Sequence, residues 1–358
     1  MKHILKESLV TLGNLLSPRE HTALEDIWPD TGGSCWVERP AGWETSAVDI
    51  SVIIPCYNNA RYVTDSIRSV LDQAGDFTFE ALVIDDGSTD NTPALLEQFR
   101  GDPRVVLRRQ ENQGHSGARN TGLSLCRGEY LLFHDSDDTM CPGALQALLA
   151  QARARDADIV AGGYLCVTPE GAVTPGKSFP DGQAPDIYAI PGMTCGKIFR
   201  RRLFRNLQFP EGFWYEDSII CQILLPLARG VYTVSSPIFW YLLNPQGVSA
   251  ASRGQLKSLE SVYVTRRLLR ERGRFGLAVD APFCGHFLHM VVLTYHRTRR
   301  LGKGALYPVF LAQREMFHGY FDGAAVPETF APLAQALRKG QFRRYVWLCE
   351  TMWLGGKL

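Results

Sequence analysis

The chain has 358 residues, of which 45% are hydrophobic and 21% charged, so it is long enough for one large or two modest domains with a real core. No apolar run reaches the roughly 18 residues of a membrane span, and the first residues lack the apolar core of a signal peptide. The nine cysteines are scattered without zinc-site spacing, which indicates a reduced, cytoplasmic protein.

The net charge of +1 conceals an uneven distribution of charge along the chain. Residues 253–358 contain 17 Lys and Arg against 7 Asp and Glu, whereas the residues before them contain 21 against 30. We therefore expect the two parts of the chain to meet different partners.

The first 48 residues are predicted to form a helical extension and a linker. Leucines at helical spacing predict a helix over residues 4–16, and a capping box at residues 17–20 predicts the start of a second helix. Residues 30–47 are rich in Gly, Pro, Ser and Thr, which is typical of a linker.

Apolar, β-branched runs then alternate with helical patterns. Strands are predicted at residues 51–55, 81–84, 105–107, 130–133 and 158–162. Helices are predicted at residues 62–73, 93–99 and 142–154, and a loop at residues 112–120 is predicted to enter a helix that continues through Leu125. This alternation predicts an α/β fold with a mostly parallel sheet flanked by helices.

Beyond this alternation the pattern is less regular. A mobile loop or hairpin is predicted at residues 168–186, a helix beginning at Glu216 and Asp217, and a strand pair at residues 231–243. Four basic helices are predicted near residues 255–272, 282–301, 304–319 and 331–353.

Polar clusters follow three of the predicted strands. Asp135, Asp137 and Asp138 follow one strand, and their mutual repulsion should raise at least one pKa unless a divalent cation such as Mg²⁺ binds there. Because parallel strands end at one edge, these residues should lie near Asp86 and Tyr57, which follow two other strands. A site for a nucleoside diphosphate needs an aromatic ring that stacks on the base, carboxylates that contact the base or ribose, and a bound cation.

Each of these residues also has a purely structural interpretation. The acidic cluster could be a solvated turn, and Asp138 could cap the helix at Pro142. Tyr57 could belong to the core, and Asp85 and Asp86 could cap a helix. Arg119 could add positive charge near the phosphates or pair with a nearby acid.

Four segments in the same order resemble the family 2 glycosyltransferases of the GT-A fold. They are residues 51–58, 83–90, 112–120 and 135–138. The resemblance covers roughly residues 50–250. It implies a GT-A domain at residues 49–250, preceded by the extension at 1–48 and followed by a basic helical region at 251–358.

The resemblance also implies a nucleotide-sugar donor, most often linked to UDP. Pro55 and Tyr57 would contact the base, Asp86 the uracil edge, and Asp135 with Ser136 the ribose and diphosphate. The implied donor site contains Pro55, Tyr57, Asn58, Asp86, Arg119, Asp135 and Ser136. Asp135 and Asp137 would hold Mn²⁺ or Mg²⁺.

A transferase of this kind needs a general base for the acceptor hydroxyl, and Asp217 matches the family's Glu-Asp pair. The divalent cation would stabilise the departing diphosphate, and one in-line displacement would invert the anomeric centre. Asp217 could alternatively be a helix-start carboxylate stabilised by the helix dipole. Lys197, Trp214 and Glu216 could lie on the acceptor side, and Lys197 could alternatively have a structural role.

The predicted function is transfer of a sugar to a glycan or lipid-linked saccharide during synthesis of a cell-surface or capsular polysaccharide. Two alternatives are a sugar-phosphate nucleotidyltransferase and a non-catalytic glycan-binding protein. The first would need a Gly-rich triphosphate loop after the first strand, which the sequence lacks.

The basic C-terminal region has three interpretations: solvated helix faces, a site for an anionic acceptor, or a contact with an anionic membrane surface. The third would make the protein peripheral at the inner face of the cell membrane. Tyr345, Trp347, Met352, Trp353 and Leu354 beside Arg343 and Arg344 suit an interfacial helix. No recognition motif for nucleic acid accompanies the charge, so we expect no such partner.

Overall fold

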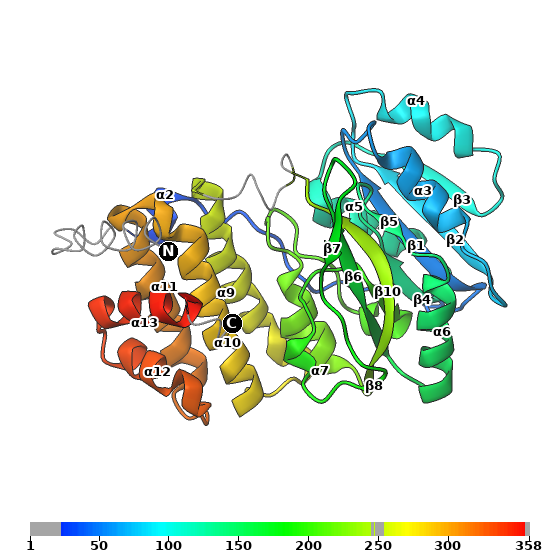
Figure 1. Cartoon of the computed structure of the whole chain (residues 1–358). Helices are drawn as coiled ribbons and strands as arrows, with labels where there is room; N and C mark the ends of the chain where they lie inside the picture. The colour runs from blue at the N-terminus through cyan, green and yellow to red at the C-terminus, as the bar shows by residue number, and fades with distance from the viewer. Residues whose placement is uncertain (1–22, 245–246, 248–253, 355–358) are drawn as a thin grey trace. The chain divides into compact units, whose positions relative to one another are not determined.

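The computed structural model describes residues 23–244, 247 and 254–354 (Figure 1). Contacts divide the described residues into two compact units, one built from residues 33–245 and the other from the residues before and after them. The helix predicted at residues 4–16 and the capping box at residues 17–20 lie outside the described residues. The domain limits at residues 48 and 250 stay predictions.

The unit of residues 33–245 contains one mixed sheet with strand order β3-β2-β1-β4-β9-β6-β10-β5. The strands are β1 (Val48–Cys56), β2 (Phe79–Asp85), β3 (Val105–Arg109), β4 (Gly128–Phe133), β5 (Thr139–Met140), β6 (Ile159–Val167), β7 (Val173–Pro175), β8 (Gly182–Gln183), β9 (Lys197–Arg200) and β10 (Val231–Leu242). Strands β3, β2, β1 and β4 are parallel, whereas β9 runs antiparallel to both of its neighbours. The predicted α/β class is confirmed.

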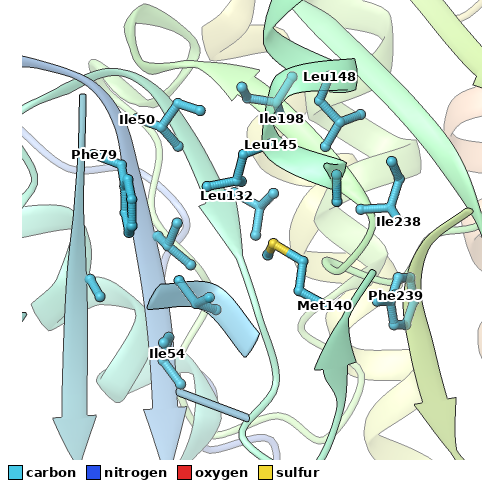
Figure 2. Packing of buried hydrophobic residues seen from close by; sticks show 14 of the residues in the cluster. Ile50, Ile54, Phe79, Leu132, Met140, Leu145, Leu148, Ile198, Ile238 and Phe239 are labelled. Atoms are coloured by element: carbon cyan, nitrogen blue, oxygen red, sulfur yellow. The ribbon is translucent and has the colours of Figure 1, made fainter. Parts of the chain in front are cut away.

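Helices cover both faces of the sheet because its strands are apolar on both faces. They are α3 (Val63–Leu71), α4 (Thr92–Leu96) with η1 (Glu97–Phe99), α5 (Gly114–Leu125), α6 (Ala144–Arg155), and η4 (Ile220–Leu224) with α7 (Leu225–Leu227). Figure 2 shows the core under α6, where Leu145 and Leu148 meet strand residues such as Leu132 and Ile198. On the opposite face, α5 lies so close to β1 that a Cβ on Gly122 would be 2.4 Å from Cγ2 of Ile53.

Two predicted elements differ from the structure. The strand pair predicted at residues 231–243 is instead the single strand β10, because the register shifts around Pro237 let the chain continue along β6. The helix predicted at residues 331–353 is divided into α12 (Ala331–Arg338) and α13 (Phe342–Leu354). Gly340 lies between them with φ of 64°, a conformation that ends a helix readily.

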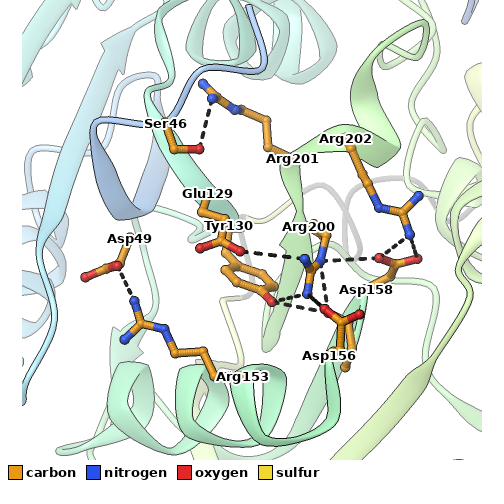
Figure 3. A network of polar contacts seen from close by, with 11 residues as sticks. Ser46, Asp49, Glu129, Tyr130, Arg153, Asp156, Asp158, Arg200, Arg201 and Arg202 are labelled. Carbon is orange, nitrogen blue, oxygen red and sulfur yellow. Dashed lines mark hydrogen bonds and ion pairs between the residues drawn. The ribbon is translucent and has the colours of Figure 1, made fainter.

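Charged side chains tie β9 into the middle of the sheet (Figure 3). The buried Asp158 accepts from Nη2 of Arg202 at 2.5 and 2.6 Å, and its Oδ1 lies 3.4 Å from Nε of Arg200. Arg200 also donates to the hydroxyl of Tyr130 at 2.7 Å. Arg200 therefore links β4, β9 and the start of β6, where the sheet changes direction.

The second unit is helical. Its elements are α2 (Leu24–Ile27), η5 (Leu256–Leu259), α9 (Glu260–Arg272), α10 (Ala281–Thr298), α11 (Lys303–Phe321), α12 and α13. Glu350 on α13 accepts from the hydroxyl of Tyr295 at 2.8 Å and from Arg299 at 2.9 Å. Within the described residues, no helix has the length and apolar character to cross a membrane.

Candidate active site

The turn after β1 is held by the side chain of Asn58. This residue has φ of 48°, in the left-handed region that Asn tolerates better than most residues. Its Oδ1 accepts from the amide of Thr89 at 2.7 Å, and its own amide donates to Oγ of Ser88 at 2.9 Å. Asn58 thus fastens the end of β1 to the turn after β2, and its predicted contact with a donor stays a prediction.

Tyr57 lies at the same edge of the sheet with 46% of its surface exposed, so its interpretation as a core residue is wrong. Pro55, two residues earlier in β1, is buried beside β2. Pro55 therefore lies in the interior, and the exposed ring of Tyr57 presents a flat apolar surface at the end of the strand. Such a surface is suited to stacking with a base.

The carboxylate of Asp86 is buried and faces the loop that follows β3. Its Oδ1 accepts from Nε2 of Gln110 at 2.8 Å and from the amide of Gln113 at 2.9 Å. The neighbouring Asp85 instead accepts from the amide of Ser88 at 2.9 Å and shapes its own turn. The two adjacent carboxylates therefore bind different segments: Asp85 binds within its own turn, and Asp86 orders the loop leading into α5.

The acidic segment after β4 meets the end of β1 and the end of β10. Nδ2 of Asn59 donates to Oγ of Ser136 at 2.9 Å, which joins the loops after β1 and β4. Asp138 is buried and accepts from the amide of Leu242 at 2.9 Å. The interpretation of Asp138 as a helix cap is wrong, because α6 begins after Gly143 without a side-chain cap.

The pKa values of the three carboxyls in this segment are shifted in different directions. Burial is the largest single influence on Asp135 and opposes its ionisation, but Arg119, His115 and Cys195 together lower the pKa of this carboxyl. Burial and the charge of Asp135 raise the pKa of Asp137, whose Oδ2 accepts from Nδ2 of Asn244 at 3.2 Å. Burial, Asp135 and Asp137 raise the pKa of Asp138 well above its usual range. A cation would relieve this repulsion.

Three residues at this place could share a metal ion. One ligand atom from each of Asp135, Asp138 and Cys195 lies within 4.8 Å of the other two. Asp137, which was predicted as a ligand, is not one of these three. Cys195 and Asn59 are not predictable from the sequence as members of this site, because no local pattern connects either residue to the strand ends that it meets in the fold.

Arg119 joins the acidic segment to Glu216. The buried guanidinium donates from Nη2 to Oδ1 of Asp135 at 2.9 Å and from Nη1 to Oε1 of Glu216. The Cζ atom of this guanidinium lies 5.5 Å from the centroid of the Phe209 ring. One guanidinium therefore connects the segment after β4 to Glu216, the residue directly before Asp217. The predicted pairing of Arg119 with an acid is confirmed.

Asp217 is partly exposed and precedes η4, where its carbonyl accepts from the amide of Ile220 at 2.9 Å. Trp214, in the same turn, is also partly exposed. The buried Lys197 donates from Nζ to the carbonyls of Met193 at 2.8 Å and Cys195 at 3.3 Å. Burial lowers the pKa of Lys197 to about 8, although the neighbouring Cys221, Cys195 and Asp217 oppose this shift.

The model of the family described as Glycosyl transferase family 2 matches residues 51–210. The glycosyltransferase GlyG of Streptococcus pneumoniae is 38% identical over 218 residues, which cover 54% of this chain and 70% of GlyG. The chondroitin synthase of Escherichia coli is 34% identical over 170 residues, covering 46% of this chain and 24% of that protein. The chain therefore spans only about a quarter of the second relative.

A solved structure with a similar fold is that of Staphylococcus aureus TarS, residues 1–349, in complex with UDP-GlcNAc. The TM-score is 0.64 at 21% identity, and the match covers 86% of this chain and 92% of the TarS chain. This likeness shows the GT-A fold. The family match and the identity to GlyG show that the chain is a glycosyltransferase belonging to glycosyltransferase family 2.

Proposed function

We propose that the protein is an inverting, metal-dependent glycosyltransferase that acts in polysaccharide biosynthesis. The observation that carries the proposal is the contact of Arg119 with both Asp135 and Glu216. This contact joins the acidic segment after β4 to Glu216, the residue directly before Asp217, and we propose Asp217 as the base. Names of relatives such as chondroitin synthase and a succinoglycan biosynthesis protein of Rhizobium meliloti, 39% identical over 112 residues, support a polysaccharide product.

The proposed donor is a UDP-sugar. The exposed ring of Tyr57 would stack on the base, and Asp86, already ordered by Gln110, would bind its polar edge. The complex of TarS with UDP-GlcNAc supports this class of donor. An N-acetylhexosamine or a hexose is the proposed sugar.

The residues at the end of β4 fit a divalent cation. Carboxylate oxygens are the ligands that Mg²⁺ and Mn²⁺ prefer, and Asp135 and Asp138 supply them next to Cys195. Asp137 lies in the same segment, where burial and the charge of Asp135 raise the pKa of its carboxyl, and a nearby cation would favour its ionised form. The cation, when bound, would neutralise charge on the departing diphosphate.

In the proposed reaction, Asp217 accepts the proton of the acceptor hydroxyl as its oxygen attacks the anomeric carbon. The bond from this carbon to the diphosphate oxygen breaks with its electrons, leaving UDP. Attack opposite the leaving group inverts the anomeric centre. Arg119 acts as a positioning residue, because its two ion pairs fix Asp135 and the residue directly before the base.

The proposal is tested with the variant D217N. We expect transfer from UDP-GlcNAc to an oligosaccharide acceptor to be lost, while stabilisation of the protein by UDP with Mn²⁺ in a thermal-shift assay is retained. The matched control is E170Q, which removes one exposed carboxylate from the same unit. Equal rates for D217N and E170Q would reject the assignment of the base.

The same measurements separate the alternative functions. A nucleotidyltransferase would release pyrophosphate from UTP and a sugar phosphate, and the membership in a glycosyltransferase family argues against this activity. A non-catalytic glycan-binding protein would neither transfer the sugar nor slowly hydrolyse the donor in the presence of Mn²⁺.

A further inference from the structure

Helix α13 presents an exposed stripe that packing does not use. Arg343, Trp347, Thr351 and Leu354 are all exposed, and their spacing of four, four and three residues places them on one side of the helix. Trp347 has 54% and Leu354 53% of its surface exposed. Large apolar side chains so exposed on one helix face indicate a contact with something outside the unit.

The opposite side of α13 is core. Tyr345 and Met352, which the sequence analysis placed among interfacial residues, are buried, so their assignment to an interface is wrong. The hydroxyl of Tyr345 donates to Oε1 of Gln313 at 2.7 Å. Trp353 stacks on His296 at 4.2 Å between ring centroids and borders the exposed stripe. The helix is thus anchored by one face, which leaves the stripe free to contact a partner.

The charge beside the stripe is positive. Arg338, Lys339, Arg343 and Arg344 are exposed between the end of α12 and the first turn of α13. Glu350 is the one acidic residue of the sequence 331–354, and it is buried against Arg299. Two arginines in the first turn of a helix oppose the helix dipole, so they do not serve the stability of α13. An external anion would relieve this conflict.

We propose that the α13 stripe docks on the surface of an anionic phospholipid bilayer. Trp347 and Leu354 would enter the boundary between headgroups and acyl chains, where tryptophan is favoured, while the four basic residues contact lipid phosphates. A soluble anion would satisfy the arginines but would leave the exposed Trp347 and Leu354 in water. The combination of charge and apolar surface therefore selects a bilayer over a soluble acidic glycan.

The expected affinities follow from the same groups. Each basic side chain near an anionic surface strengthens binding by about fivefold, so the variant R343Q/R344Q should bind about 25-fold more weakly. Loss of the exposed ring in W347S should weaken binding by about tenfold or more. Binding should also fall with added salt, because the charges are exposed and screened.

The test is sedimentation of the full chain with vesicles of phosphatidylcholine alone or mixed with phosphatidylglycerol. We expect the protein to sediment with the anionic vesicles only, and both α13 variants to bind these vesicles more weakly by the factors given above. The matched controls are R270Q/R300Q, which removes two exposed arginines elsewhere in the helical unit, and Y320S, which removes an exposed ring from α11. Both controls should bind like the unchanged protein.

Three results would overturn the proposal. They are no binding to anionic vesicles, equal losses in R270Q/R300Q and R343Q/R344Q, or binding of a soluble acidic polysaccharide with the same dependence on Trp347. Thermal unfolding confirms that each variant is folded, as expected for exposed residues. Vesicle binding needs neither donor nor acceptor, so its outcome is independent of the proposed sugar transfer.

Discussion

The ion pairs of Arg119 predict a specific pattern of stability changes. In R119M the buried Glu216 loses its partner, and Asp135, which is partly exposed, loses a hydrogen bond. Removing one partner of a buried ion pair costs about 3–5 kcal/mol, because the remaining charge is left without compensation. Most of this loss should come from Glu216, the more deeply buried of the two acids.

The variant E216Q should cost less, about 1–3 kcal/mol, because Arg119 keeps Asp135 as a partner. In R119M/E216Q no unpaired charge remains at position 216, so the double variant should lose at least about 2 kcal/mol less than the sum of the single variants. Urea unfolding followed by tryptophan fluorescence at neutral pH measures the three losses. Additive losses would refute the idea that Glu216 depends on Arg119.

The ion pairs of Arg119 also predict that R119M loses activity for a reason other than its lower stability. Because Asp217 follows Glu216 directly, R119M should displace the proposed base by a fraction of a side chain's length. Misplacement of about 1 Å can cost about 100-fold in rate, so kcat should fall under conditions where the variant is fully folded. An unchanged kcat would show that Arg119 does not position the base.

Three further variants test local features of the structure. The pKa of Lys197 is lowered to about 8 from 10.5, so between these pH values the unfolded chain binds the extra proton and stability should rise with pH by up to about 3 kcal/mol. K197M should lose this rise in urea unfolding across that pH range, whereas the exposed K177M should keep it. N58A should cost about 2 kcal/mol, since it removes the acceptor for Thr89 and keeps a positive φ, and N58D should cost less in the same assay. G122A should lower the free energy of unfolding by about 1–3 kcal/mol through overpacking against β1, whereas G101A, with open space around the added Cβ, should not.

Each of these variants has a result that contradicts its reasoning. A K197M protein with the same pH dependence as the unchanged chain would show that Lys197 does not titrate in this range. Equal losses in N58A and N58D would show that the side-chain oxygen is not the relevant group. A stable G122A protein would show that α5 can move away from β1 without cost.

Much of the sheet unit could be predicted because its signals are local. Strands buried on both faces are continuous apolar runs, and helices between them show their own period. Local signals were insufficient for β10, which was predicted as a strand pair, because the neighbouring strand β6 holds the chain in one strand through register shifts around Pro237. They were also insufficient at Gly340, where a helical pattern continues across a residue with positive φ.

The sequence by itself determined the α/β class, the order of the strands along the chain and the polar residues that end them, because these properties depend on residues close together in the chain. Only the tertiary structure decided which of these residues meet. Arg119 contacts partners 16 and 97 residues away, and Cys195 joins two carboxylates from another strand end. Such contacts arise from the packing of distant segments, and no local pattern of residues encodes them.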